Sequence, residues 1–92
     1  MSETLAGTGT VSTAPSVGLS WEASTSSVEG YNVYRSLTST GKYSKLTASL
    51  DANTSYTDSS VSSGTTYYYV TTAVGTDGVE SAYSNQVQVS IP

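Results

Sequence analysis

The sequence predicts an all-β domain, a seven-stranded antiparallel β-sandwich, and three observations support this fold class. Apolar and polar residues alternate with a period of two in residues 17–21, 31–35 and 87–91, which is the pattern of half-buried strands. No window of eleven residues has the apolar spacing of a helix, and 19 serines and 15 threonines among 92 residues lower the helix propensity. Turn residues separate the apolar segments at short intervals, which is typical of a sandwich.

The length of the chain fits one domain. Residues 1–9 offer little to bury, so we expect a flexible leader there and an ordered domain over residues 10–92. Each apolar segment between turn residues is then expected to form one strand. In chain order these strands are residues 8–13, 16–22, 30–36, 43–46, 55–58, 66–74 and 85–91.

Local residue types justify these elements in turn. The chain is expected to become ordered around Thr10 or Val11, and the second, third and seventh strands carry the clear alternation. Turn residues at 39–41 and 51–53 precede the fourth and fifth strands. Asp77-Gly78 after the sixth strand is the strongest hairpin signal, because glycine supplies the positive φ that such a turn requires.

Four short segments occur in a fairly specific order: Leu19-Ser20-Trp21, the GYNVYR sequence from Gly30 to Arg35, Val61 with Gly64-Thr65-Thr66-Tyr67, and Ala73-Val74 leading into Asp77-Gly78. Together they resemble a fibronectin type III domain, especially the bacterial secreted and cell-surface type that often lies beside carbohydrate-active catalytic domains. The resemblance covers residues 11–92. It implies an immunoglobulin-like sandwich with the first, second and fifth strands in one sheet and the other four in the second sheet.

The resemblance and the alternation together predict the structural core. Trp21 matches the buried tryptophan of the family, and Tyr67 matches the tyrosine whose hydroxyl bonds the backbone a few residues upstream. A sugar-stacking role for Trp21 is less favoured, because it alternates with the inward-facing Val17 and Leu19. Thr71 departs from the family by placing a hydroxyl inward, where it needs a partner. The predicted core residues are Trp21, Tyr31, Val33, Val61, Tyr67 and Tyr69.

The residues that alternate with the core residues on the third and sixth strands are predicted to face outward. This outward face contains Tyr34, Tyr68 and Val70, with Tyr43 on the adjoining strand. The preferred interpretation is a cross-strand aromatic pair that stabilises the sheet. The alternative is a contact face for a protein or a glycan, since tyrosine provides contact area at low entropic cost. Tyr83 is the single aromatic anchor in the loops at residues 23–29 and 75–84, which the family topology places at one end of the sandwich.

The residue counts exclude several function classes. Three cations against seven carboxylates, a net charge of -4, leave no basic stripe for nucleic acid or an anionic membrane. No apolar run is long enough to insert into a membrane. Because the chain has no histidine and no cysteine, it can form neither a Ser-His-Asp or Cys-His triad nor a typical zinc, copper or iron site. No cofactor is expected.

Two remaining arrangements are formal candidates for catalysis. Ser39 and Lys42 have the spacing of a Ser-x-x-Lys nucleophile pair, but Gly41 places them in a turn and not on the helix that this chemistry needs. Asp58 is expected to accept a backbone N–H from the turn at Ser59 and Ser60. The carboxylates are interpreted as solvated loop charges and not as a hydrolytic pair: Glu22, Glu29, Asp51, Asp58, Asp77 and Glu80.

The sequence therefore predicts a non-catalytic spacer or interaction module of a secreted or cell-surface multidomain protein, monomeric and extracellular. The alternative is a protein- or carbohydrate-binding domain, natural or engineered as a scaffold. It would use residues 23–29 and 75–84 or the Tyr34 and Tyr68 face. A fragment of a carbohydrate-processing enzyme is the third and least favoured class.

Overall fold

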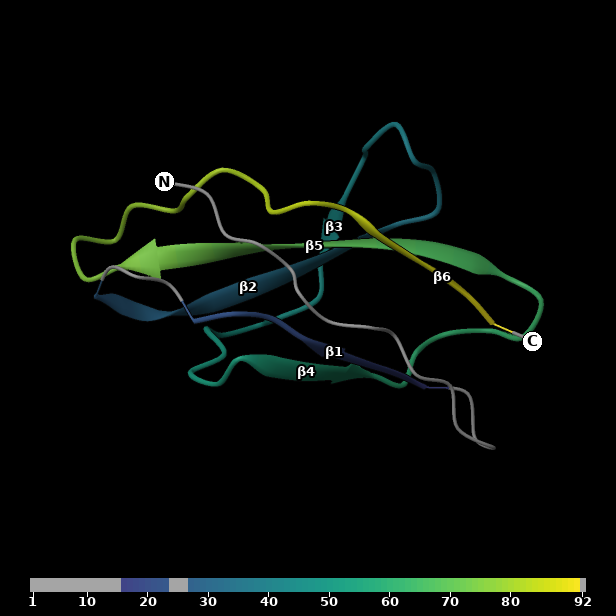
Figure 1. The fold of residues 1–92 in the computed structure, drawn as a ribbon, viewed down its shortest axis with the longest axis horizontal. Coiled ribbons are helices and arrows are strands. Elements are labelled where there is room, and N and C mark those ends of the chain that lie inside the picture. The colour runs from purple at the N-terminus through teal and green to yellow at the C-terminus, as the bar shows by residue number, and fades with distance from the viewer. Residues whose placement is uncertain (1–15, 24–26, 92) are drawn as a thin grey trace.

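The structure is a computed structural model that describes residues 16–23 and 27–91. These residues form six strands in two antiparallel sheets, and none of them lies in a helix (Figure 1). The predicted leader and first strand lie outside the described residues. The strands are β1 (Val17–Ser20), β2 (Val28–Ser36), β3 (Ser44–Lys45), β4 (Ser55–Asp58), β5 (Thr66–Gly75) and β6 (Val87–Ser90).

The two sheets divide the strands as the family resemblance implies. β1 pairs with β4, and the second sheet has the order β3-β2-β5-β6. The longest pairing joins β2 to β5, with Tyr34 opposite Val70 and Arg35 opposite Tyr69. Figure 1 shows the β1–β4 pair lying against one side of the larger sheet. The all-β antiparallel prediction is confirmed, and the described residues contain six of the seven predicted strands.

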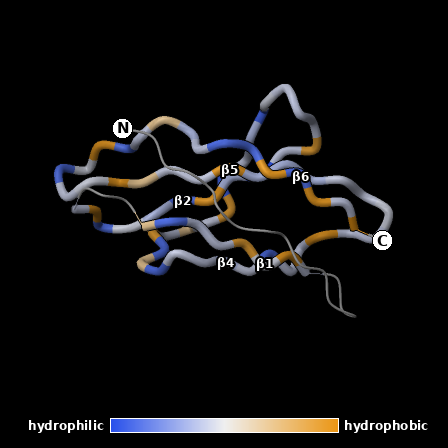
Figure 2. The backbone as a smooth tube through the Cα atoms, in the orientation of Figure 1, coloured by the Kyte–Doolittle hydropathy of each residue, from blue (hydrophilic) through white to orange (hydrophobic). Residues whose placement is uncertain are grey.

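The core lies between the two sheets. β1 directs Val17 and Leu19 inward, and the Trp21 ring that follows packs edge-on against Tyr31 at 5.5 Å between centroids. Short hydrophobic stretches on the strands are separated by more hydrophilic turns (Figure 2). All six residues that the sequence assigns to the core are at most 9% exposed: Trp21, Tyr31, Val33, Val61, Tyr67 and Tyr69.

Two local features join the strands. The Tyr67 hydroxyl accepts a hydrogen bond from the backbone N–H of Ser62 at 2.9 Å, five residues upstream. This is the bond that the family resemblance implies. At the other end of β5, Gly78 has φ of 83°, and the N–H of Gly75 donates to the carbonyl of Val79. The hairpin signal of Asp77-Gly78 is therefore confirmed.

The segment after this hairpin runs back beside β5 before β6 begins. The backbone N–H groups of Ser81 and Ser84 donate to the carbonyls of Ala73 and Thr71. In return, the hydroxyls of Ser81 and Ser84 accept hydrogen bonds from the N–H groups of Ala73 and Thr71, both at 2.9 Å. Serine side chains thus replace backbone acceptors along this edge, which fixes residues 80–84 against the four-stranded sheet.

Candidate functional site

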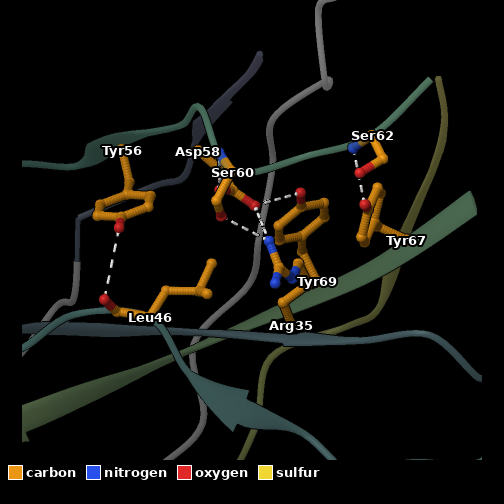
Figure 3. A network of polar contacts seen from close by, with 8 residues as sticks. All are labelled: Arg35, Leu46, Tyr56, Asp58, Ser60, Ser62, Tyr67 and Tyr69. Atoms are coloured by element: carbon orange, nitrogen blue, oxygen red, sulfur yellow. Dashed lines mark hydrogen bonds and ion pairs between the residues drawn. The ribbon is translucent and has the colours of Figure 1, made fainter. Parts of the chain in front are cut away.

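A buried polar network connects the two sheets at the end of β4. The Asp58 carboxylate is 3% exposed and accepts a hydrogen bond from the Arg35 guanidinium at 2.9 Å and one from the Tyr69 hydroxyl at 2.8 Å (Figure 3). Its other oxygen accepts the backbone N–H of Ser60 at 3.0 Å and the Ser60 hydroxyl at 2.6 Å. The Arg35 guanidinium also lies 5.0 Å from the centre of the Tyr67 ring.

The pKa values of this network follow from burial and from these bonds. Burial alone would raise the pKa of Asp58, but hydrogen bonds from Ser60, Tyr69 and Arg35 outweigh it and lower that pKa. Burial, together with the bond to Asp58, raises the pKa of Tyr69. Burial opposes the charged form of Arg35, but the carboxylate of Asp58 more than offsets this and raises its pKa. The network therefore holds one buried negative and one partly buried positive charge at neutral pH.

This arrangement is structural, and it corrects the interpretation of Asp58 as a solvated charge. The expected bond from the backbone of Ser60 is present, but the carboxylate lies in the interior because Arg35 and Tyr69, opposite each other on β2 and β5, both point toward it. The sequence contains a signal that Arg35 needs a buried partner, but no signal that names Asp58 as that partner. Arg35 faces the same side of the strand as the buried Tyr31 and Val33, because side chains two residues apart point the same way. The alternation therefore predicts an inward cation, which requires a partner.

Three tyrosines form a cluster on the outer side of the four-stranded sheet. The ring of Tyr83 lies 5.3 Å from that of Tyr34 at an angle of 74°, and 5.0 Å from that of Tyr43 at 59°. The Tyr43 hydroxyl accepts a hydrogen bond from Gln86 at 2.6 Å. Tyr83 is 50% exposed, so the central ring of the cluster presents half of its surface to solvent.

Beside this cluster, a single carboxylate is held by three neutral donors. The oxygen Oε2 of Glu80 accepts hydrogen bonds from the amide of Asn32 at 3.2 Å and from the hydroxyls of Tyr34 and Thr72. Asn32 is itself fixed, because its amide oxygen accepts a bond from the Thr47 hydroxyl at 2.8 Å. Asn32 and Thr72 are opposite each other on β2 and β5 and are buried, so the donors belong to rigid strands.

The surroundings of the Glu80 carboxylate favour its ionised form. Hydrogen bonds from Thr72 and Tyr34 lower the pKa of Glu80 despite a smaller opposing effect of burial. Burial and the bond to Glu80 raise the pKa of Tyr34 to about 12. The face therefore presents a fixed negative charge next to the neutral Tyr34 phenol at physiological pH. We call Tyr34, Tyr43, Tyr83 and Glu80 the tyrosine–glutamate face.

The tyrosine–glutamate face borders a shallow hollow of about 270 Å³. Residues of β2, of β5 and of the segment that follows the hairpin line it. Aromatic, hydroxyl and carboxylate groups thus converge on one small concavity, as in many sites that bind small polar ligands. The lining residues are Tyr34, Thr72, Glu80, Ser81, Ala82 and Tyr83.

The structure rearranges the contact residues that the sequence proposes. Tyr83, assigned to a loop, meets Tyr34 and Tyr43, assigned to the sheet face, because residues 80–84 turn back along β5. The assignment of Val70 to an exposed face is wrong. Val70 does point outward, but it is 2% exposed, because this short side chain lies on a central strand directly opposite the larger Tyr34. Tyr68 is half-buried and makes no ring contact with the described tyrosines.

Sequence reasoning missed the role of Glu80. The residue is exposed, as expected for a loop charge, but its carboxylate is not free. No local pattern marks this position. The only signal is the length of the segment between the sixth and seventh predicted strands, residues 75–84, which exceeds a tight hairpin and leaves residues available to cover the sheet.

Residues 16–23 and 27–91 contain no other arrangement typical of a metal, membrane or Ser-x-x-Lys site. Within these ranges no group of three or more acidic residues is arranged to hold a metal ion. None of the described segments is a helix with the length and apolar character needed to cross a membrane. Ser39 and Lys42 lie in a turn in which Gly41 and Lys42 both have positive φ, so they do not form the helical pair that Ser-x-x-Lys chemistry requires. Part of the predicted loop at residues 23–29 lies outside the described residues.

Sequence comparisons match this chain to short segments of much larger proteins. Amylopullulanase of Thermoanaerobacter thermohydrosulfuricus is 44% identical over 72 residues, which cover 78% of this chain and 5% of that protein. Alpha-amylase of Niallia circulans is 36% identical over 85 residues, which cover 90% of this chain and 6% of that protein. The chain therefore spans only a small part of the relatives it matches. No family model matches the sequence.

A structural comparison identifies a relative of similar size. An Fn3-like protein from Clostridium thermocellum superimposes with a TM-score of 0.78 and is 36% identical. The alignment covers 89% of this chain and 83% of that one. The strand division, the buried tryptophan and the bond from Ser62 to the Tyr67 hydroxyl agree with this likeness. The chain belongs to the fibronectin type III family.

Proposed function

We propose that the chain is a non-catalytic spacer and interaction module of an extracellular or cell-surface bacterial protein that acts on α-glucans. The observation that carries this proposal is that the matched segment is a small part of each relative. Each match covers most of this chain but only 5% or 6% of an enzyme named amylopullulanase or alpha-amylase. A segment of that size is the size of one domain among several, and we infer that the reaction of those enzymes takes place in other parts of their chains.

The chemistry of the chain supports a non-catalytic role. It has no histidine or cysteine, its arginine is paired with Asp58, and its most rigidly held exposed carboxylate, Glu80, stands beside tyrosines and not beside a second acid. Glycoside hydrolysis normally needs two carboxylates at a set separation. A sandwich with a packed core has a defined shape, which is the property that a spacer requires.

Two experiments on the purified domain test this proposal. Incubation with starch and pullulan is expected to release no reducing sugar, and turnover above a heat-denatured control contradicts the non-catalytic role. For the spacer role, the domain is placed between two fluorescent proteins. Its energy-transfer distribution is expected to be narrower than that of a Gly/Ser linker of 92 residues. An equally broad distribution contradicts the spacer role.

A further inference from the structure

We propose that the tyrosine–glutamate face is a carbohydrate-binding site that holds one stretch of a neutral α-glucan chain. The proposal deepens the interaction role given above and rests on it for the identity of the glycan. It is carried by the geometry of the hollow at Glu80 and Tyr83, and each feature of that geometry limits the chemistry of the occupant.

The first feature is a rigid, half-exposed aromatic surface. Tyr83 is 50% exposed, and contacts with Tyr34 and Tyr43 hold its ring in place before any ligand arrives. Little side-chain entropy remains to be lost on binding. One face of a pyranose ring consists of C–H groups, which pack on the electron-rich face of an aromatic ring. Tyr83 thus fits the apolar side of a sugar.

The second feature is an oriented acceptor within the same hollow. Three donors hold Oε2 of Glu80, whereas Oε1 accepts no hydrogen bond from the described residues. Sugar hydroxyls are donors, and a bond from a hydroxyl to an ionised carboxylate is stronger than one between neutral groups. Because Asn32 and Thr72 are buried on strands, the carboxylate needs no reorganisation to accept such a bond. Ser81, which also lines the hollow, adds a polar group on its rim.

Charge and ring geometry exclude other occupants. An anionic ligand would meet the charge of Glu80 within a chain of net charge -4. A quaternary ammonium needs ring faces that converge around an empty cage. Here the ring centroid of Tyr83 lies 5.3 Å from that of Tyr34 and 5.0 Å from that of Tyr43. The three rings therefore pack on one another and leave no empty cage between them, so they present a platform. A hollow of about 270 Å³ suits a sugar unit and not a folded protein partner, which buries a much larger area.

The test measures binding of maltoheptaose and pullulan to the purified domain by isothermal titration and by NMR chemical-shift mapping. We expect a weak affinity, in the millimolar range, with the largest shifts at residues 80–84. Tyr83→Ala is expected to weaken binding about tenfold or more, since it removes the platform. Glu80→Gln is expected to weaken binding about threefold to tenfold, since it replaces a charged acceptor with a neutral one.

The matched control is Tyr68→Ala, which removes a tyrosine from the outer side of the same sheet but outside the cluster. It is expected to bind as the unaltered chain does. Thermal unfolding of every variant separates loss of the site from loss of the fold. The inference is overturned if no glucan binds, if Tyr83→Ala and Glu80→Gln leave the affinity unchanged, or if choline binds and glucan does not. These failures leave the spacer role intact, because turnover and energy transfer test that role separately.

Discussion

At the scale of single residues, β5 contains two adjacent buried threonines, of which one has a hydrogen-bonded hydroxyl and the other does not. Thr71 is 0% exposed, and its hydroxyl has no hydrogen-bond partner in the part of the chain that the structure describes. Thr72 is 1% exposed, and its hydroxyl donates to Glu80. Burying an unpaired hydroxyl costs about 1–3 kcal/mol, whereas a paired one makes a net contribution to stability. The same substitution is therefore expected to act differently at the two positions.

Thr71→Val keeps the shape of the side chain and removes the unpaired hydroxyl. We expect an unchanged or higher melting temperature, with a gain of up to about 1 kcal/mol in the free energy of unfolding. Thr72→Val, the control, is expected to lower the melting temperature, because it takes one donor from Glu80. Thermal unfolding followed by circular dichroism measures both. A clear decrease for Thr71→Val would show that its hydroxyl is bonded and needed.

Asp58 is the residue whose loss is expected to cost most. Asp58→Asn removes the charge that pairs with Arg35 and accepts from Tyr69. Losing one partner of a buried pair typically costs about 3–5 kcal/mol, and the partial exposure of Arg35 reduces our expectation to about 2–4 kcal/mol. Urea unfolding measures this loss. Glu22→Gln, a charge removal at an exposed position, is the control, and an equal effect of the two changes contradicts the assignment.

At the scale of the elements, tyrosine hydroxyls join strands to the backbone of neighbouring segments. Tyr67 at the start of β5 accepts from the N–H of Ser62 at 2.9 Å, whereas Tyr56 on β4 donates to the carbonyl of Leu46 at 3.5 Å (Figure 3). The first distance is that of a normal hydrogen bond, and the second is at the limit of one. The turn before β5 should therefore depend on Tyr67 more than the segment before β4 depends on Tyr56.

Tyr67→Phe is expected to lower the free energy of unfolding by about 1 kcal/mol or somewhat more, because it leaves the N–H of Ser62 without this partner. Tyr56→Phe also removes one hydroxyl and keeps the ring, and a smaller loss is expected for it. Hydrogen exchange of the Ser62 amide provides a local measurement, and faster exchange is expected in Tyr67→Phe. Equal losses for both variants would contradict the structural role assigned to the shorter bond.

At the scale of the whole molecule, stability should depend on pH only at the extremes. The chain has no histidine, so we expect a constant melting temperature between about pH 6 and pH 8. The pKa values of Asp58 and Glu80 are lower in the folded than in the unfolded chain. As the pH falls below about 5, the unfolded state therefore binds more protons, and stability is lost.

In alkali, the tyrosines determine how the stability of the fold changes with pH. Folding raises the pKa of Tyr34 to about 12 and also raises that of Tyr69, so above about pH 10 the unfolded chain loses protons first and stability falls again. Melting temperatures measured from pH 2 to pH 12 should form a plateau with two flanks. A change of about 10 °C within the plateau contradicts this prediction. Asp58→Asn should weaken the acid flank.

The sequence by itself determined the properties that local geometry controls. Side chains alternate across a strand, so the inward parity of Tyr31, Val33, Tyr67 and Tyr69 follows from position along the chain. Glycine tolerates positive φ, so the turn at Gly78 was predictable in the same way. The family resemblance added the division of strands between the two sheets, for the strands that the structure describes.

Only the tertiary structure decided which distant residues meet. Asp58 lies 23 positions from Arg35, and Glu80 lies 48 positions from Asn32. Their contacts depend on the register between strands and on the path of residues 80–84 along β5. No local pattern encodes these, because hydrophobic alternation is identical for many registers that differ by two residues. For this reason the core was visible in the sequence, whereas the ion pair at its end and the tyrosine–glutamate face were not.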